Sequence, residues 1–367
     1  MTRWLSWHRR LTGPAPLGWT ERLLLALLIP AGWLYGVAGL IRHRLYRLQL
    51  LSSYRAPVPV ISVGNLAAGG TGKTPTVDYV LKFLLAQGRN VAVVSRGYGG
   101  RGVPGGIGVV SDGAGPLLAP EQCGDEPYLL ALRNPQAKVV VAPRRREGVR
   151  LAVERLGAEV VLLDDGFQHL AVARDLDIVL LDGERPLGNG HVLPAGILRE
   201  FPTALQRGHL FVLTRSADKK PALPPLPGPV LHSRHQLAGA AVDLHGQVVP
   251  LTELVGRRGV AFAGIADPER FFASLRSAGV EPVATLGFPD HAAYDQRLLA
   301  RLHSAATGAD YLITTEKDAV KLRPGEFSIP CYRVPLELAL QEAGKLEEIL
   351  QTVLAKRGTH GHFPRTA

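Results

Sequence analysis

Residues 57–79 combine the residue types and the spacing of a phosphate-binding loop. A β-branched run at 58–63 leads into a glycine-rich stretch, and the apolar residues after Lys73 recur with helical spacing. A strand, a glycine-rich loop and a helix N-terminus in this order present backbone N–H groups and the positive end of the helix dipole, so a polyphosphate is the expected ligand. Lys73 would contact its β- and γ-phosphates, and the Thr74 hydroxyl would bind Mg²⁺.

One position departs from the strict motif G-x-x-x-x-G-K-[ST], which has a glycine where this chain has Ala67. The alternative is an ordinary glycine-rich turn between a strand and a helix. We favour nucleotide binding because the strand, the loop and the helix all agree with it. The predicted phosphate contacts are Gly69, Gly70, Thr71, Gly72, Lys73 and Thr74.

A second stretch, EVVLLDDGFQH at 159–169, is an apolar strand that ends in Asp164 and Asp165. P-loop enzymes place the carboxylate that holds Mg²⁺ at the end of such a strand. A strand-end turn is the alternative, because Asp-Gly is a common turn pair. With a phosphate loop upstream, we expect a magnesium site formed by Thr74, Asp164 and Asp165, and the division of roles between the two aspartates stays open.

Two further polar residues could take part in catalysis, and each also has a simple structural explanation. Asp125, in CGDEP at 123–127, could cap a helix, with Glu126 and Pro127 in the first turn, or could direct a carboxylate at a phosphate-transfer site. His291, in FPDH at 288–291, would by itself be read as a surface histidine. The residues alone leave both alternatives open for Asp125 and favour a surface position for His291.

The elements that must position these residues are short apolar runs that alternate with helical patterns. Strands are predicted at 90–95, 139–142, 160–163 and 177–181. Nearly uniform apolar strands between helices indicate a parallel sheet covered on both faces, in which ligands bind at the carboxyl ends of the strands. SRGYGG, at 95–100, would place Arg96 and Tyr98 at the same edge.

The second half of the chain predicts a smaller α/β unit. The stretch 219–229 contains five prolines and reads as a connection. Predicted strands follow at 230–233, 259–263, 282–286 and 311–313. Asp267-Pro268 opens a helix, residues 315–318 have capping-box spacing, and 336–354 is helical by period. The predicted division is an N-terminal segment at 1–50, a P-loop domain at 51–218, a linker at 219–229, a second domain at 230–335, and a C-terminal helix and tail at 336–367.

The N-terminal region contains an apolar stretch long enough for a membrane. Residues 23–41 are 19 residues without a charge, bracketed by arginines, and would form a helix about 28 Å long. We expect a retained membrane helix; a buried core helix is the alternative. Arginines on both sides leave its orientation open, so spanning the bilayer and dipping into one leaflet fit equally well. Gly32 and Gly36 form a GxxxG pattern, which is weak support for dimerisation.

Composition narrows the function classes only slightly. The chain has 367 residues and a formal charge of +10, which is compatible with nucleic acid, an anionic membrane or a phosphorylated substrate. No interleaving of basic and aromatic residues supports nucleic acid. The two cysteines, Cys123 and Cys331, have no metal-binding spacing, so a reduced compartment is expected and no zinc or iron–sulfur site is predicted.

Several motifs in a fixed order make the chain resemble one family. GNLAAGGTGKTP, SRGYGG, GDEP, DDGFQH, GHVLPAGILRE, FPDH and TTEKDAVK, after a basic apolar N-terminus, are similar to the motifs of tetraacyldisaccharide 4′-kinases. The resemblance covers residues 20–325. It implies a P-loop NTPase-type α/β fold with a mostly parallel sheet and helices on both faces, a second smaller α/β domain, and an N-terminal apolar membrane helix.

The same resemblance implies an activity and its ligands. Members of the family transfer the γ-phosphate of Mg-ATP to the 4′-hydroxyl of a tetraacylated glucosamine disaccharide 1-phosphate in lipid A biosynthesis, at the cytoplasmic face of the inner membrane. The expected cofactors are ATP and Mg²⁺. The expected partners are the acylated disaccharide 1-phosphate and membrane lipids, with no nucleic acid and no obligate protein partner.

The resemblance also distributes roles among the residues. Lys73 and Thr74 would bind ATP and Mg²⁺, and Asp164 and Asp165 would belong to the metal environment. Asp125 would accept the proton of the acceptor hydroxyl, because a sugar hydroxyl is a poor nucleophile. His291 is similar to a histidine that reaches across the cleft between the domains to orient or tune that aspartate. Residues assigned to substrate positioning are Arg96, Arg199 and Glu200, for which surface ion pairs are the alternative.

A membrane-associated P-loop ATPase that acts as a switch, without a lipid-sugar acceptor, is the competing function. Such a switch needs residues that sense the γ-phosphate. The chain has no N-K-x-D sequence of the kind that reads guanine, which argues against a GTPase.

Overall fold

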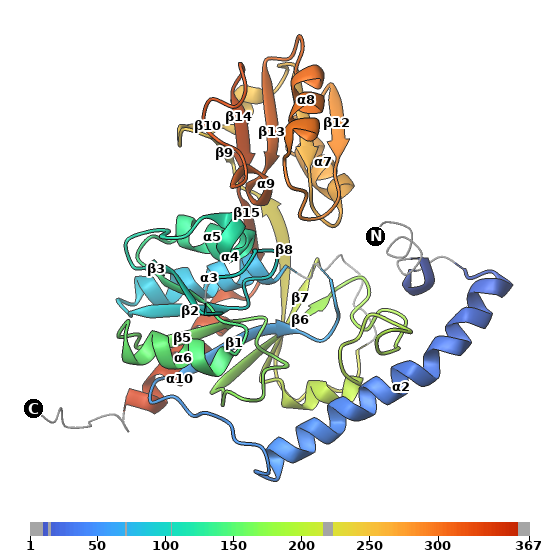
Figure 1. The fold of residues 1–367 in the computed structure, drawn as a ribbon, viewed down its shortest axis with the longest axis vertical. Coiled ribbons are helices and arrows are strands. Elements are labelled where there is room, and N and C mark those ends of the chain that lie inside the picture. The colour runs from blue at the N-terminus through green and yellow to red at the C-terminus, as the bar shows by residue number, and fades with distance from the viewer. Residues whose placement is uncertain (1–9, 14–15, 70–71, 104, 216–222, 359–367) are drawn as a thin grey trace, which may run out of the picture. The chain divides into compact units, whose positions relative to one another are not determined.

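A computed structural model describes residues 10–13, 16–69, 72–103, 105–215 and 223–358 (Figure 1). The chain forms two compact units, and each consists of segments that are distant in sequence. The first unit comprises Met1–Arg96, Arg144–Arg234 and Leu340–Ala367, and the second comprises Gly97–Pro143 and His235–Ala339. Because 97–143 groups with the second unit, the units do not follow the order of the chain, and the predicted domain boundaries stay a prediction.

The first unit contains a parallel sheet with strand order β8-β7-β6-β1-β5-β2. Its central strands are buried along their whole length, as expected for strands covered on both faces. Helices α3 (Lys73–Ala86) and α6 (Arg145–Glu154) pack on it. The strands are β1 (Val60–Asn65), β2 (Val91–Ser95), β5 (Val160–Asp164), β6 (Leu176–Asp182), β7 (Leu210–Thr214) and β8 (Val230–Leu237). A 3₁₀ helix, η1 (Pro202–Arg207), precedes β7.

The second unit contains a mixed sheet with strand order β10-β9-β14-β13-β11-β12. The four strands from β14 to β12 are parallel, whereas β9 pairs antiparallel with both β10 and β14. The strands are β9 (Ala240–Asp243), β10 (Val248–Pro250), β11 (Gly259–Ala263), β12 (Ala284–Gly287), β13 (Tyr311–Thr315) and β14 (Cys331–Val334). The helical elements in this part are η2 (Leu251–Leu254), α7 (Pro268–Ser277), α8 (Gln296–Ala305) and α9 (Glu316–Ala319).

The same unit includes an antiparallel pair of strands and two short helices from residues 97–143. Strands β3 (Gly108–Asp112) and β4 (Lys138–Val141) pair with a bulge between Val109 and Ser111. Helix α5 (Asp125–Arg133) follows α4 (Pro120–Cys123) and packs on α9. Helix α5 is therefore held by the second unit, although it precedes most of the parallel strands in sequence.

The predicted helix over 336–354 is wrong at its beginning. Leu336–Leu340 forms strand β15, and the helix α10 (Ala343–Gly358) starts after it. The sequence LELAL alternates apolar and charged or small residues with period two, and Leu338 is buried while Glu337 is exposed. A backbone hydrogen bond from Gln341 to His232 follows the strand. Of the predicted linker, 223–229 has no helix or strand, and 219–222 lies outside the described residues.

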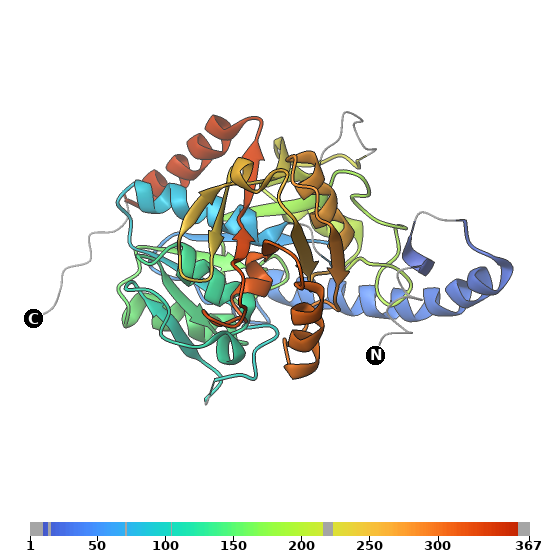
Figure 2. The ribbon, with the colours of Figure 1, turned by 90° about the horizontal axis from the view of Figure 1, so that it is seen from above.

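The predicted N-terminal apolar helix is part of α2 (Trp19–Arg47), which has 29 residues. One face packs within the first unit: a Cβ added to Gly32 would lie 2.8 Å from the Val192 carbonyl oxygen, and one added to Gly36 would lie 2.4 Å from the Phe201 ring. Gly32 and Gly36 thus allow close packing inside the chain. The opposite face exposes large apolar side chains, including Leu27 (69%) and Leu34 (74%). Figures 1 and 2 show α2 beside the loops of residues 183–201.

Within the described residues, α2 is the one helix long and apolar enough to cross a membrane. Only 11% of its apolar window is buried, so a buried core helix, the alternative reading of the sequence, does not describe it.

Candidate functional site

The phosphate-loop region connects β1 to α3 in the first unit. Gly72 takes a left-handed conformation (φ 80°) as the N-cap of α3, which a residue with a side chain would rarely adopt. The first N–H groups of a helix have no partner inside the helix, so this end of α3 can receive an anion. Thr74 is buried in the first turn. Gly69 is described, whereas the predicted contacts Gly70 and Thr71 lie outside the described residues.

The side chain of Lys73 lies at the carboxyl end of β1. Its Nζ donates to Asn65 Oδ1 at 3.3 Å and lies 3.7 Å from Asp165 Oδ1. Asn65 is the last residue of β1, and its amide also donates to the Ala67 carbonyl. The lysine therefore already faces acceptor oxygens at the place where phosphates are expected.

Asp164 is the last residue of β5, which pairs with β1, and Asp165 follows it; their side chains make different contacts. The Ser95 hydroxyl donates to Asp164 Oδ2 at 3.0 Å, from the end of the neighbouring strand β2. Asp165 has a left-handed backbone (φ 55°), which is uncommon for a residue other than glycine. At Gly166, an added Cβ would lie 2.6 Å from the Leu163 side chain, so the turn requires this glycine.

Asp165 belongs to a network of charges. Arg199 Nη1 donates to both of its carboxylate oxygens at 2.8 Å, and Lys73 Nζ lies 3.7 Å from one of them. Burial alone would raise the pKa of Asp165, but the charges of Lys73 and Arg199 outweigh burial and hold the pKa below its usual value. The carboxylate is therefore an anion over the physiological pH range.

The three predicted substrate residues are all on the first unit. Arg199 pairs with Asp165, as described above. Glu200 pairs with Arg207 through two contacts of 2.9 Å, and Arg96 is exposed directly after β2. Their roles toward a substrate stay predictions.

Two basic residues near the aspartates were missed by sequence reasoning. Arg145, the first residue of α6, is 2% exposed and its Nη2 donates to the Asp164 carbonyl at 3.3 Å. Burial lowers the pKa of Arg145 to about 10, against the opposite effect of Asp164 and Asp165. His169 is neutral at physiological pH, because burial and the charge of Arg145 lower its pKa to about 4. In the arginine-rich segment 144–146, nothing local marks one arginine as buried.

The second unit contains a separate cluster around Asp125. The residue before it, Gly124, is the N-cap of α5 and has φ 91°; a Cβ there would lie 2.4 Å from the Tyr98 carbonyl oxygen. This close approach fixes the start of α5. Asp125 is the first residue of the helix, and its side chain does not cap it. Instead, Asp125 Oδ2 lies 3.0 Å from His291 Nδ1 and 3.0 Å from Lys321 Nζ.

The pKa values of Asp125 and His291 are shifted in opposite directions. Burial would raise the pKa of Asp125, but the hydrogen bond from His291 and the charge of Lys321 lower it overall. The same hydrogen bond raises the pKa of His291, against the effect of burial. His291 has a left-handed backbone (φ 56°), and its ring makes an edge contact with Tyr98 at 5.7 Å between centroids. The pKa shifts of Asp125 and His291 both favour the charged forms, so the pair is stabilised by their mutual attraction.

Lys321 was not singled out by the sequence, although it ends the motif TTEKDAVK. Its Nζ also lies 3.7 Å from Asp318 Oδ1 and donates to the Ala292 carbonyl at 3.3 Å. His291 Nδ1 and Lys321 Nζ thus contact the same oxygen of Asp125. In the part of the chain that the structure describes, Oδ1 of Asp125 has no hydrogen bond and can receive one from another molecule. Lys317, whose role the sequence left open, pairs with Glu126.

Three comparisons with known proteins agree with one another. The family model for tetraacyldisaccharide-1-P 4′-kinase matches residues 24–355. The tetraacyldisaccharide 4′-kinase of Syntrophotalea carbinolica is 54% identical over 97% of this chain and 100% of its own, and that of Geobacter sulfurreducens is 46% identical over 94% and 98%. A crystal structure described as the apo form of LpxK from Aquifex aeolicus in complex with ATP is similar with a TM-score of 0.78. It is 32% identical and covers 90% of this chain and 99% of its own.

Proposed function

Because the chain belongs to the tetraacyldisaccharide-1-P 4′-kinase family, we propose that it transfers the γ-phosphoryl group of ATP to the 4′-hydroxyl of a tetraacylated glucosamine disaccharide 1-phosphate. The observation that carries the proposal is the position of Lys73, at the N-terminus of α3 and beside the carboxylate of Asp165. ATP phosphates would compete with Asp165 for this lysine. The transferring group is stabilised mainly by positioning and by charge.

The residues around the loop fit Mg²⁺ as a partner of ATP. Thr74 offers a hydroxyl, and Asp164 and Asp165 offer carboxylate oxygens, the hard donors that Mg²⁺ prefers. Among the described residues, no group of three or more acidic, histidine or cysteine side chains could hold a metal alone. Mg²⁺ in nucleotide sites is commonly held by one or two carboxylates together with substrate phosphates. When bound, Mg²⁺ would neutralise charge on the β- and γ-phosphate oxygens.

Asp125 would act on the acceptor hydroxyl. Its Oδ1 accepts the hydrogen bond of the 4′-hydroxyl and later its proton, while His291 and Lys321 hold Oδ2. A carboxylate with a lowered pKa is a weak base, but it suffices because phosphoryl transfer has a loose transition state in which proton transfer is late. His291 and Lys321 are therefore positioning residues that keep Asp125 ionised and oriented.

Helix α2 would attach the enzyme to the membrane. Contacts of Gly32, Gly36 and Arg42 with the first unit occupy one face of α2, and the apolar side chains point outward from the other. A helix of this kind lies in the interface of one leaflet, with Arg44 and Arg47 near anionic headgroups. We therefore place the enzyme at the cytoplasmic face of the inner membrane, where ATP is available, with membrane lipids as partners.

A transfer assay with radiolabelled ATP tests the proposed function. The labelled phosphate should appear in the disaccharide lipid, and Lys73→Ala should lower turnover a hundred- to a thousandfold or more, in the range of about 3 kcal/mol and above. Lys82→Ala is the matched control, because Lys82 lies on the same helix and pairs with Asp78 four residues away. ATP hydrolysis without transfer to the lipid would favour the switch function instead.

A further inference from the structure

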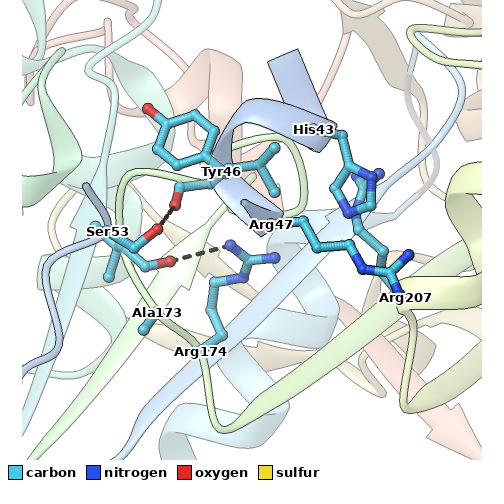
Figure 3. A pocket seen from close by; sticks show the side chains of 9 residues that line it. His43, Tyr46, Arg47, Ser53, Ala173, Arg174 and Arg207 are labelled. Atoms are coloured by element: carbon cyan, nitrogen blue, oxygen red, sulfur yellow. Dashed lines mark hydrogen bonds between the residues drawn. The ribbon is translucent and has the colours of Figure 1, made fainter. Parts of the chain in front are cut away.

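A shallow cavity at the C-terminal end of α2 has no role in the reaction proposed above. It has a volume of about 310 Å³ and lies within the first unit. Figure 3 shows its lining side chains, which come from the end of α2, the segment after it, the loop before β6 and the segment before β7. The polar residues that line it are His43, Tyr46, Arg47, Ser53, Arg174 and Arg207.

The position of the cavity separates it from the nucleotide site. Residues 170–174 precede β6, and Arg207 precedes β7, so this lining belongs to the amino-terminal edge of the parallel sheet. The phosphate loop follows the carboxyl end of β1, a parallel neighbour of β6. The two sites therefore lie at opposite edges of the sheet.

The cavity has an excess of positive charge. Arg174 pairs with Asp177, and Arg207 pairs with Glu200. Arg47 makes no ion pair with any described residue. Burial and the charges of Arg207 and Arg47 lower the pKa of His43, although Glu200 acts in the opposite direction. Arg207 also retains a buried Nε–H that has no hydrogen-bond partner among the described residues.

The surroundings of the cavity are those of a membrane surface. The chain leaves α2 through a left-handed Gln49 (φ 59°), with hydrogen bonds from Gln49 N to Tyr46 O and from Leu50 N to Leu45 O. These hydrogen bonds occupy carbonyl groups in the last turn of the helix. They reduce the repulsion between the negative end of the helix dipole and a bound anion. Leu48 and Leu50 directly after Arg47 are 67% and 69% exposed. The apolar face of α2 thus continues past the basic cavity.

We propose that this cavity binds the phosphate group of an anionic membrane phospholipid. Arginine forks match phosphate geometry, and basic pockets beside membrane helices are suited to lipid headgroups. The exposed leucines and the apolar face of α2 favour a lipid over a free anion. The inference rests on the proposed function only in that α2 lies in a membrane interface.

Vesicle binding of the full-length enzyme tests the role of Arg47. Arg47→Gln removes the charge inside the cavity, and Arg44→Gln removes one from the same helix turn, where the exposed Arg44 does not line the cavity. With phosphatidylglycerol-containing vesicles, general attraction predicts about a fivefold loss of partitioning for either variant. A specific contact predicts a loss of about 60-fold or more for Arg47→Gln, because a hydrogen bond to a charged group, worth at least about 1.5 kcal/mol, is lost as well. Equal losses for the two variants would overturn the proposal.

Titration of the His43 imidazole identifies the ligand. Its NMR signal can be assigned by comparison with His43→Gln. Short-chain soluble phosphatidylglycerol should raise the pKa of His43, because a bound anion offsets the arginine charges. Inorganic phosphate and glucosamine 1-phosphate are tested separately. An equal effect of inorganic phosphate would mean that the site takes a free anion, and a stronger effect of glucosamine 1-phosphate would assign the cavity to the substrate; either overturns the lipid assignment. Phosphoryl transfer measured on the same samples reports separately on the proposed function.

Discussion

Replacing Lys321 by methionine would separate its electrostatic role from simple packing. Methionine keeps an unbranched chain of similar length and removes the charge beside Asp125 Oδ2. The ion pair is well shielded, since the Lys321 and Asp125 side chains are 13% and 12% exposed. A hydrogen bond between charged groups is worth about 1.5–3 kcal/mol, and one pKa unit corresponds to about 1.4 kcal/mol. Removing the charge of Lys321 should therefore raise the pKa of Asp125.

The assay is the pH dependence of kcat/KM for phosphoryl transfer, expressed as the ratio of variant to wild type. This ratio cancels the titration of ATP itself. For Lys321→Met the ratio should fall as the pH is lowered toward 5, because protonated Asp125 cannot accept the hydroxyl proton. At pH 8 a loss of roughly tenfold should remain, because Asp125 is then held by His291 alone. Lys321→Arg should restore the shape of the profile.

Lys317→Met is the matched control for the loss of one positive charge nearby. Lys317 pairs with Glu126 and makes no direct contact with Asp125. The ratio of kcat/KM between Lys317→Met and wild type should change with pH much less than the same ratio for Lys321→Met. A Lys321→Met enzyme with a lower rate at every pH and no change in the profile would refute the electrostatic role, and so would an equal shift in both variants. Thermal melts of both variants show whether either loses the fold.

Two further predictions concern packing and the charged pair. Gly36→Ala should destabilise the protein by about 1–3 kcal/mol in thermal melts, since its Cβ would overlap the Phe201 ring. The same change at Gly39, where a Cβ would lie 3.8 Å from Glu200 Cγ, should be neutral or stabilising, and equal effects would contradict the packing. The Asp125–His291 pair should stabilise the fold most between about pH 4 and 6.5. The pKa of His291 is raised by folding, so its contribution to stability is present below about pH 6.5 and is lost as the pH rises. The pKa of Asp125 is lowered by folding, so its contribution is lost as the pH falls below about 3.8. His291→Gln should therefore cost more unfolding free energy at pH 6 than at pH 9, and a constant cost across this range would contradict the pairing.

The sequence predicted the strands that are buried on both faces. β1, β5 and β11 are continuous apolar runs, and such runs are what a covered parallel strand requires. The strands without a prediction are mostly short or antiparallel, such as β10, whose residues are largely exposed. Their stability comes from pairing with distant segments, which leaves little local pattern. β7 is the exception, because its residues are an uninterrupted apolar run that was available to the sequence analysis.

The residues of the candidate site also fall into those that a local pattern predicts and those that only the fold brings together. Residues within one motif, such as Lys73 and Thr74, could be predicted because their spacing is itself the signal. The pairing of Arg199 with Asp165 joins residues 34 apart, and Lys321 lies far from Asp125 along the chain. No local period connects such residues. Their proximity follows only from the packing of the units that hold them.

Asp318 shows how a correct local interpretation can hide a second role. The capping geometry expected from the sequence is present, because Thr315 Oγ1 accepts from the Asp318 N–H at 3.3 Å. The side chain of Asp318, however, is fully buried and accepts from the Gly264 N–H at 2.9 Å. A Cβ at Gly264 would lie 2.8 Å from Asp318 Oδ1, so the contact depends on this glycine.

The same glycine connects Asp318 to His291, and Asp318 itself lies near Lys321. The Gly264 carbonyl accepts from the backbone N–H of His291 at 3.1 Å, which helps to hold the left-handed conformation of that residue. Asp318 Oδ1 in turn lies 3.7 Å from Lys321 Nζ. A strained backbone persists only where its surroundings hold it. Asp318 therefore supports the position of His291 through the backbone and that of Lys321 through charge, and both side chains then contact one oxygen of Asp125.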